Sequence, residues 1–316
     1  MRPPLFDATA RTVLVTGATG FVGTQLVRAL LQESHEVIVL SRRPQEAARL
    51  FDGRVRALAS LRALPPATRI DVVVNLAGAR ILGPRWTDRR KAALRRSRVS
   101  LTRDLVDWIG AAAHRPFLLL SASAIGYYGT QAIGDATRLD EAAPPQPVFM
   151  SDLCREWEEA AGAAVRHGVR VECMRFGLVL GRGGALPMML LPVKLGLGGR
   201  LGSGRQWLSW IHVDDVVGVM AHRWRRAQAG LDGEAGKGAS NVTAPDCVSQ
   251  EEFSRTAARV WRRPSIVPTP AWPMRLLLGE QADLLLEGQR VVPARLEREG
   301  YVFRYPGLEG ALRSLK

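Results

Sequence analysis

Seven residues near the amino terminus constrain the fold most, and they read Gly17-Ala18-Thr19-Gly20-Phe21-Val22-Gly23. They lie between a β-branched, apolar run over residues 12–16 and a helical pattern over residues 21–32, so the sequence predicts a strand, a tight turn and a helix. Glycines at this spacing let the backbone approach a pyrophosphate, and the helix N-terminus offers free N–H donors. We therefore predict that a dinucleotide contacts Gly17, Thr19, Gly20, Phe21 and Val22. A purely structural turn is the alternative.

Further short apolar runs follow this turn, at residues 36–40, 54–58, 71–75, 117–121 and 169–174. Helical patterns separate the later runs, at about residues 88–113 and 151–167. Strands that alternate with helices are typical of a parallel sheet, because each parallel crossover needs a connecting helix. We predict the α/β class, with a Rossmann-like, doubly wound parallel sheet over residues 10–177 and returning segments near 208–245.

The character of the sequence changes after Phe176, where glycine- and proline-rich stretches replace the regular alternation. We expect a smaller, mixed C-terminal region on the substrate side, made of residues 178–207 and 246–316. Within it, Ser249 and Glu252 have the spacing of a capping box for a helix that ends near Trp261. Residues 276–286 carry a further helical pattern.

The residues after the second predicted strand bear on cofactor choice, and they are Ser41-Arg42-Arg43. Sites selective for NAD usually place an Asp or Glu here, which bonds the ribose 2′-hydroxyl and would repel a 2′-phosphate. Guanidinium groups pair with a phosphate in bidentate fashion, and a hydroxyl donates to it. Ser41, Arg42 and Arg43 therefore favour NADPH or NADP over NAD. The alternative is that the two arginines are solvated loop cations.

A second segment at the same edge of the predicted sheet is Asn75-Leu76-Ala77-Gly78, which ends the apolar run that starts at Asp71. Ligands of doubly wound sheets bind at the carboxyl ends of the strands, where small residues let them approach the backbone. We predict that Leu76, Ala77 and Gly78 lie beside the cofactor. An ordinary turn at a strand end is the alternative.

The net charge of +14 would suit nucleic acid or an anionic membrane surface. However, only four of the 44 basic residues are lysines, and the arginines are scattered apart from a modest cluster over residues 89–98. A codon bias toward arginine explains this distribution without a polyanionic partner. We therefore expect a small-molecule substrate, and neither nucleic acid nor a membrane as a partner.

The three cysteines and five histidines are dispersed, with no Cys-x-x-Cys or His-x-x-x-His pair. This spacing argues against a disulfide framework and a metal site, so we predict no metal. No apolar run approaches the roughly 20 residues that span a bilayer. The first residues lack the hydrophobic segment of a signal peptide, and we expect a cytoplasmic location.

Together these motifs resemble the extended, epimerase-like branch of the short-chain dehydrogenase/reductase superfamily. The resemblance rests on the glycine turn, on residues 75–78, and on the segments at residues 121–123, 175–181 and 210–216. More narrowly, the chain is similar to an atypical subgroup of nucleoside-diphosphate-sugar epimerase-like proteins with a small C-terminal domain of unknown function, here residues 265–316. Segments at residues 189–192, 196–199, 286–291 and 300–301 match that subgroup.

The resemblance also implies which residues bind NADPH: Ser41, Arg42, Leu76, Ala77, Arg98 and Ser151. Two of these have another interpretation from the sequence alone. Arg98 lies in the long helical pattern, where it is equally one more cation on a solvated face. Ser151 is equally an N-cap at the start of its helix.

Members of this superfamily usually act through a serine and a tyrosine that is followed four residues later by a lysine, whose ammonium lowers the pKa of the phenol. No Tyr-x-x-x-Lys occurs in this chain. Ser123 occupies the serine position and Tyr127 follows it, so these two are the catalytic candidates. Tyr127 needs some other cation to shift its pKa. The alternative is that Tyr127 and Tyr128 only shape the wall of a pocket.

Two further groups of residues have competing interpretations. His212 with Asp214 and Asp215 resembles an acid–base pair or a metal site, but we expect Asp214 or Asp215 to cap the following helix. A run of polar and aromatic residues is a candidate lining for a substrate cleft, with the arginine for an anionic group and the tryptophans for stacking: Arg205, Gln206, Trp207 and Trp210.

The sequence as a whole predicts an NADP(H)-binding protein that acts as an oxidoreductase or epimerase on an unidentified small molecule. The alternative is a non-catalytic NADPH-binding sensor or scaffold, because the Tyr and Lys pair is absent. The sequence leaves open whether the chain is an enzyme, which substrate it takes and how many copies assemble.

Overall fold

A seven-stranded parallel sheet organises the computed structural model, which describes residues 4–6, 9–83, 85–231 and 236–316. Pro84 and residues 232–235, which fall inside the ranges expected for the first region, lie outside the described residues. The strand order is β10-β6-β5-β4-β1-β2-β3, and every neighbouring pair is parallel. The strands are β1 (Thr12–Thr16), β2 (Glu36–Leu40), β3 (Arg56–Leu58), β4 (Val72–Asn75), β5 (Leu118–Ala124), β6 (Arg170–Phe176) and β10 (Lys237–Val242). The predicted doubly wound α/β sheet is confirmed.

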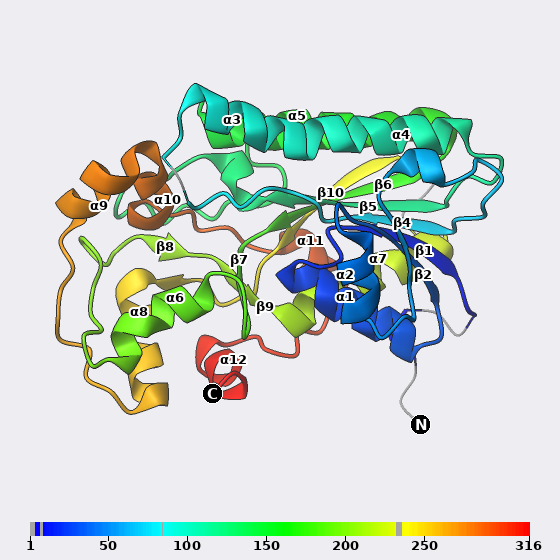
Figure 1. Ribbon diagram of the computed structural model, residues 1–316. Coiled ribbons are helices and arrows are strands. Elements are labelled where there is room, and N and C mark those ends of the chain that lie inside the picture. The colour runs from blue at the N-terminus through cyan, green and yellow to red at the C-terminus, as the bar shows by residue number, and fades with distance from the viewer. Residues whose placement is uncertain (1–3, 7–8, 84, 232–235) are drawn as a thin grey trace.

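Helices cover both faces of this sheet, as Figure 1 shows. One layer holds α3 (Asp88–Arg95), α4 (Leu101–Ala111) and α5 (Phe149–Gly162), and the other holds α1 (Phe21–Gln32) and α7 (Val213–Gln228). Alternate residues of β1 serve the two cores: Val13 and Val15 pack with α1 and α7, whereas Leu14 packs with α4. The apolar runs in the sequence are continuous because both faces of the strands are buried.

The long helical pattern near residues 88–113 forms three consecutive pieces. A π-helical turn, η2 (Arg96–Ser100), separates α3 from α4. Shorter helical elements complete the first region: α2 (Pro44–Leu50), η1 (Leu61–Ala63), η3 (Ile125–Tyr128) and η4 (Ala163–His167).

The smaller C-terminal region lies beyond the carboxyl ends of the strands (Figure 1). Its core is shared by α6 (Leu186–Lys194), α8 (Gln250–Trp261) and α12 (Leu308–Ser314). The serine half of the predicted capping box is confirmed at α8, because the Ser249 hydroxyl accepts the backbone N–H of Glu252 at 3.1 Å. The region also contains β7 (Leu178–Leu180) parallel to β9 (Trp210–His212), β8 (Trp207–Leu208) antiparallel to β11 (Val248–Ser249), α9 (Ala271–Leu278), η5 (Gly279–Ala282), α10 (Asp283–Leu286) and α11 (Ala294–Arg298).

The expected cap of α7 is wrong in its residue. His212 is the N-cap, and its Nδ1 accepts the backbone N–H of Asp214 at 3.1 Å. Asp215 is buried in the first turn and accepts the backbone N–H groups of Arg304 at 2.7 Å and Tyr305 at 2.9 Å. The carboxylate of Asp215 therefore fastens the C-terminal segment to α7, a contact that depends on tertiary packing.

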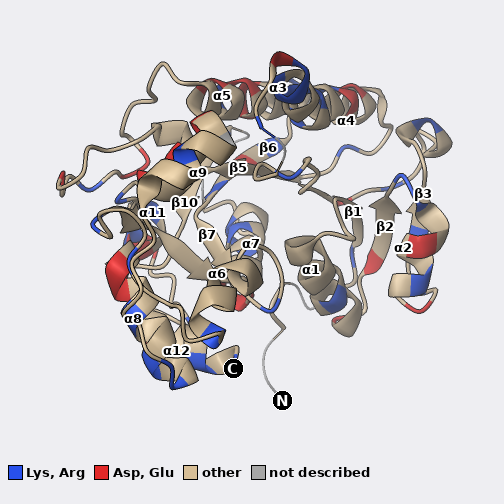
Figure 2. Ribbon diagram, turned by 60° about the vertical axis from the view of Figure 1, so that its left-hand side comes forward, with Lys and Arg blue, Asp and Glu red and all other residues tan. Residues whose placement is uncertain are grey.

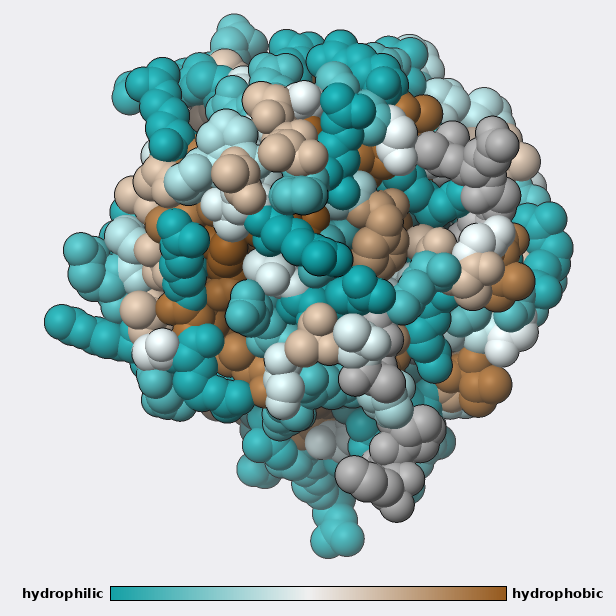
Figure 3. Space-filling view, turned by 90° about the vertical axis from the view of Figure 1, so that its right-hand side faces the viewer, coloured by the Kyte–Doolittle hydropathy of each residue, from teal (hydrophilic) through white to brown (hydrophobic). Residues whose placement is uncertain are grey.

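Charged residues are spread over the helices, strands and loops of both regions (Figure 2). The side of the molecule opposite the C-terminal region is mainly hydrophilic, with hydrophobic residues in separate pieces between polar ones (Figure 3). One cluster of charges lies inside. Glu299 contacts His222 at 3.2 Å, Arg295 at 3.0 Å and Arg223. Arg295 in turn pairs with the buried Glu172 at 3.2 Å, so the cluster joins α11 to α7 and β6.

This cluster predicts a pH dependence of folding stability. Burial alone would raise the pKa of Glu299, but the hydrogen bond with His222 and the nearby arginines lower it to about 2. A depressed pKa contributes stability that is complete above the ordinary value near 4.5 and is lost as the pH falls toward 2. We expect Glu299→Gln to lower the free energy of unfolding at pH 7 and to flatten its change between these pH values. Urea unfolding at several pH values measures this, with Glu309→Gln at an exposed pair as the control. Equal pH profiles for wild type and Glu299→Gln would contradict it.

Candidate functional site

The glycine turn brings the N-terminus of α1 against the end of β4. Gly17 has a φ of +69°, and a Cβ there would lie 2.6 Å from the carbonyl carbon and oxygen of Leu76. A Cβ on Gly23 would lie 2.2 Å from the carbonyl oxygen of Gly17. Gly20 is the N-cap of α1, and its N–H donates to that same oxygen at 3.0 Å. The spacing of the glycines therefore serves close backbone contacts that side chains would prevent.

The other residues predicted in this turn lie in two environments. Thr19 and Gly20 are exposed at the carboxyl edge of the sheet. The ring of Phe21 packs under the loop that leads to α6, since a Cβ on Gly183 would lie 2.8 Å from its Cδ2. Val22 is partly buried against the core beneath α1. The first turn of α1 thus presents backbone N–H groups at the edge while its side chains anchor the C-terminal region.

Ser41, Arg42 and Arg43 follow β2, which pairs with β1, so they lie beside the glycine turn. The Ser41 hydroxyl accepts the backbone N–H of Arg43 at 3.2 Å. Arg43 forms an exposed ion pair with Glu46 at 3.2 Å. Arg42 is exposed, and among the described residues no carboxylate pairs with it. Its guanidinium is therefore available at the edge of the sheet.

Arg98 is 8% exposed, so it does not lie on a solvated helix face. It belongs to the π-helical turn and donates to the carbonyl oxygen of Ala79 at 2.9 Å. Its Cζ would lie 3.0 Å from a Cβ on Gly78. Burial lowers the pKa of Arg98 to about 10. In the described part of the chain no carboxylate forms an ion pair with Arg98, so a buried cation lies directly beneath the segment that follows β4.

Ser151 is not the N-cap of α5, because the helix begins at Phe149 and Val148 holds the N-cap position. The buried hydroxyl of Ser151 accepts the backbone N–H of Gln146 at 3.0 Å and donates to the carbonyl oxygen of Tyr127. It therefore fixes the backbone of one catalytic candidate.

Ser123 is part of a buried ionic network. Its hydroxyl donates to Glu158 at 2.7 Å. Arg175 donates to the two oxygens of the same carboxylate, from Nε at 2.8 Å and from Nη2 at 2.9 Å. The two hydrogen bonds make the ion pair bidentate. All three side chains are buried, so the pair is shielded from solvent. The proton of the Ser123 hydroxyl is already committed to a carboxylate on α5.

Arg175 also contacts both tyrosines after β5. It donates to the Tyr128 hydroxyl at 2.9 Å, and that hydroxyl donates to Asn241 at 2.7 Å. Burial raises the pKa of Tyr128 to about 12. The Tyr127 ring stacks on the guanidinium of Arg175, with 3.4 Å between Cζ and the ring centroid. Arg175 is thus a cation stacked on the Tyr127 ring, a contact that the sequence did not indicate.

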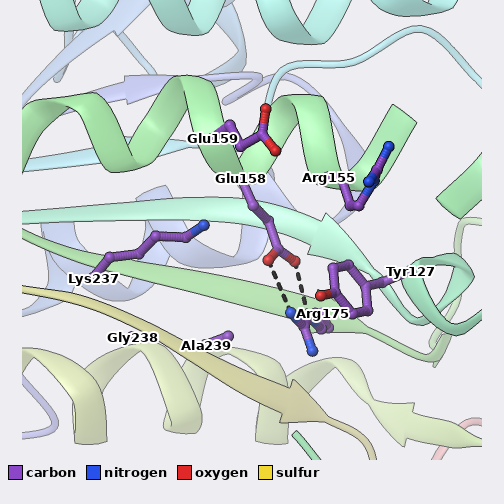
Figure 4. A pocket seen from close by; sticks show the side chains of 8 residues that line it. All are labelled: Tyr127, Arg155, Glu158, Glu159, Arg175, Lys237, Gly238 and Ala239. Carbon is purple, nitrogen blue, oxygen red and sulfur yellow. Dashed lines mark hydrogen bonds and ion pairs between the residues drawn. The ribbon is translucent and has the colours of Figure 1, made fainter. Parts of the chain in front are cut away.

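A cavity of about 220 Å³ opens beside this network. The Tyr127 phenol points into it, together with groups from α5, β6 and β10 (Figure 4). None of the residues predicted to bind the cofactor lines this cavity. The lining residues are Tyr127, Arg155, Glu158, Glu159, Arg175, Lys237, Gly238 and Ala239.

The sequence analysis missed Glu158 and Arg175 as site residues. They stand 17 positions apart, as their hydrogen bonds record, and neither belongs to a spaced motif of acid and base. The only signal in the sequence was the presence of a charged residue, Arg175, inside an apolar strand and of another, Glu158, inside an amphipathic helix.

Two of the expected cleft residues are buried instead, Gln206 and Trp210, and Trp210 belongs to the core of the C-terminal region. The indole N–H of Trp207 donates to the carbonyl oxygen of Asp135 at 2.8 Å, and Arg290 stacks on its ring.

The described ranges contain no group of three or more His, Cys, Asp or Glu side chains able to hold a metal ion. In the same ranges, every helix is too short or too polar to cross a membrane.

Comparison with known proteins places this geometry in a family. Residues 13–236 match the NAD dependent epimerase/dehydratase family, and residues 269–315 match a domain of unknown function named DUF1731. Epimerase family protein YfhF of Bacillus subtilis is 38% identical, over 96% of this chain and 97% of the relative. The chloroplastic SDR39U1 homolog of Arabidopsis thaliana is 40% identical, over 96% of this chain and 86% of the relative.

A solved structure gives the same result for the fold. The crystal structure of human epimerase family protein SDR39U1 with NADPH has a TM-score of 0.84 and 34% identity, and the match covers 96% of this chain and 98% of that chain. The likeness therefore spans the sheet and the C-terminal region together. The chain belongs to the NAD dependent epimerase/dehydratase family.

Proposed function

We propose that this chain binds NADPH at the carboxyl ends of β1, β2 and β4. The observation that carries the proposal is the backbone contact at Gly17, which leaves no room for a Cβ and holds the first turn of α1 at the edge of the sheet. Free N–H groups and the helix dipole at such a turn favour a pyrophosphate. The human relative, at 34% identity, was solved with NADPH.

In this proposal three groups of residues hold different parts of the cofactor. The turn from Gly17 to Val22 binds the pyrophosphate, and Leu76, Ala77 and Gly78 lie along the dinucleotide. The buried Arg98 supplies positive charge beneath Gly78. Ser41, Arg42 and Arg43 bind the 2′-phosphate, which supports NADPH over NADH. Ser151 contributes by fixing the chain at Tyr127.

Reversal of one charge tests the cofactor choice. We expect Arg42→Asp to weaken NADPH binding about tenfold or more, because a charge-assisted hydrogen bond worth about 1.5–3 kcal/mol is replaced by repulsion. NADH affinity should change little, since NADH carries no 2′-phosphate. Fluorescence titration with both cofactors measures this. Arg49→Asp, an exposed arginine on α2, is the matched control. Equal loss of NADPH and NADH affinity in Arg42→Asp would refute the assignment.

We further propose that the chain is an oxidoreductase or epimerase on a small molecule, with Tyr127 as proton donor. Bound NADPH supplies a hydride. Two observations support the role: the phenol of Tyr127 points into the cavity (Figure 4), and the guanidinium of Arg175, 3.4 Å from the ring centroid, holds the ring in place. In this proposal Ser123 is the second catalytic residue, and the hydrogen bond that its hydroxyl donates to Glu158 holds it in position.

A non-catalytic NADPH-binding sensor or scaffold is the second candidate. It is favoured by the engaged hydroxyl of Ser123 and by the absence of Tyr-x-x-x-Lys from the sequence.

A cytoplasmic location stays a prediction, since the Arabidopsis relative is named chloroplastic.

Turnover separates the two candidates. For the enzyme we expect NADPH absorbance to fall with one class of carbonyl compound, and Tyr127→Phe to slow this at least about 100-fold while NADPH affinity is kept. Tyr305→Phe is the matched control. Tight NADPH binding without oxidation by any member of a carbonyl library would support the sensor.

A further inference from the structure

Helix α6 has apolar side chains on opposite sides. Leu186 and Leu190 are buried in the core that α6 shares with α8. Met188, Leu191 and the C-cap residue Leu195 face solvent, with exposed fractions of 76%, 57% and 65%. Their spacing of three and four residues places them in one stripe along the helix. A helix with apolar residues on every side is normally covered by protein or lipid.

The C-terminal region carries a second exposed apolar helix. Both ribbon views place α9 above α6 (Figures 1 and 2). Trp272, Leu276 and Leu277 of α9 have exposed fractions of 69%, 68% and 73%.

Two loop segments connect these helices. Residues 198–201 run alongside residues 265–269, joined by backbone hydrogen bonds of 3.0 and 2.8 Å. Leu197 and Ile266 are exposed in these loops. We call the following set the apolar face: Met188, Leu191, Leu195, Leu197, Ile266, Trp272, Leu276 and Leu277.

The two sequence segments that form the apolar face are rich in cations. Residues 182–205 and 262–277 contain seven arginines and lysines and no acidic residue. Arg275 pairs with Asp283 and Glu287. Over the described ranges, the other six form no ion pair with a carboxylate. They are Arg182, Lys194, Arg200, Arg205, Arg262 and Arg263.

We infer that the apolar face docks on the surface of an anionic lipid bilayer. Apolar side chains and a tryptophan enter the boundary between headgroups and acyl chains, while surrounding cations attract anionic lipids. A second copy of this chain would bring its own cations against these. Nucleic acid would pair with the cations but leave the apolar side chains exposed to water. The sequence-based expectation of no membrane partner rested on the scatter of arginines along the chain, whereas the two segments that form the apolar face carry six arginines.

Vesicle sedimentation tests the inference with the full chain. We expect the protein to sediment with phosphatidylcholine vesicles that contain about 30% phosphatidylglycerol and to stay in solution with phosphatidylcholine alone. Raising the salt from about 50 mM to about 500 mM should weaken binding, since charge attraction is screened.

Matched variants locate the contact. The triple variant Leu191→Ser, Trp272→Ser and Leu276→Ser should weaken vesicle binding at least about tenfold, whereas Leu50→Ser on α2 should not. The double variant Arg200→Glu and Arg263→Glu should also lose binding. Arg49→Glu with Arg62→Glu changes the net charge equally on another surface and should retain most of it. NADPH titration of each variant checks that it is folded.

Three results would overturn the inference. One is equal binding to neutral and anionic vesicles, and another is unchanged binding by the triple variant. The third is a dimer in light scattering that becomes monomeric in the triple variant without any lipid binding, which would assign the apolar face to contact between copies.

Discussion

Gly17→Ala should abolish NADPH binding within the accessible concentration range and lower the free energy of unfolding. The new Cβ would lie 2.6 Å from the carbonyl carbon and oxygen of Leu76, and the neighbour is backbone that cannot rotate away. The φ of +69° adds a further cost of about 1–2 kcal/mol for a residue with a side chain. Any shift that relieves this contact moves α1 away from the end of β4, where we place the pyrophosphate.

A second glycine separates these two costs. Gly53 has a φ of +72°, but nothing lies within 4 Å of the Cβ that a substitution would add. Gly53→Ala should therefore show only the conformational penalty of about 1–2 kcal/mol and keep NADPH affinity. Urea unfolding and fluorescence titration of both variants measure the comparison. If Gly17→Ala bound NADPH as well as Gly53→Ala, the close approach at Leu76 would not be needed for the cofactor.

The second large effect is expected at the buried ion pair of Glu158 and Arg175. Glu158→Ala should destabilise the fold by about 3–5 kcal/mol, because it leaves the guanidinium of Arg175 buried without its carboxylate. The hydroxyl of Ser123 also loses its acceptor. Replacement of both partners, as Glu158→Gln with Arg175→Met, should recover much of the loss, since no unpaired charge remains.

An exposed pair provides the comparison for this measurement. Glu46→Ala removes the partner of Arg43, whose side chain is largely in solvent, and should cost at most about 1 kcal/mol. Urea unfolding of Glu158→Gln, Arg175→Met and the double variant that combines them gives the coupling free energy between Glu158 and Arg175. A Glu158→Ala variant as stable as Glu46→Ala would show that the buried network contributes nothing to the fold.

Local patterns in the sequence predicted the parts of the fold that depend on neighbouring residues. Helix α1 spans Phe21–Gln32 as predicted, because an apolar stripe and a glycine turn define both its face and its start. Ser249 caps α8 for the same reason. Strand β5 continues to Ala124, beyond the predicted end at Ser121. Its last residues are small or carry a hydroxyl, so the sequence does not indicate a strand there, but pairing with β6 keeps them in the sheet.

The contacts of the candidate site depend on tertiary packing and were therefore harder to predict from the sequence. The sequence placed Ser123 just beyond the predicted strand, and it lies within the longer β5 of the structure. Its partner Glu158 comes from a helix that follows a long loop. The residues next to Arg98 in the sequence are like those around a surface arginine. Only the packing of its helix on the sheet buries Arg98. Asp215 was expected to cap a helix and instead binds two backbone N–H groups near the end of the chain.

The π-helical turn at Arg96–Ser100 has a consequence for how this chain tolerates insertions and deletions. Such a turn adds one residue to a helix and rotates everything beyond it by about 100° relative to what precedes it. The turn lets Leu94 on α3 and Leu105 on α4 point into separate cores of the same layer. Removal of a single residue here would rotate α3 relative to α4 and turn the buried side chains of one of them away from its core. We therefore expect the number of residues from α3 to α4 to be fixed, although much of this helical stretch faces water.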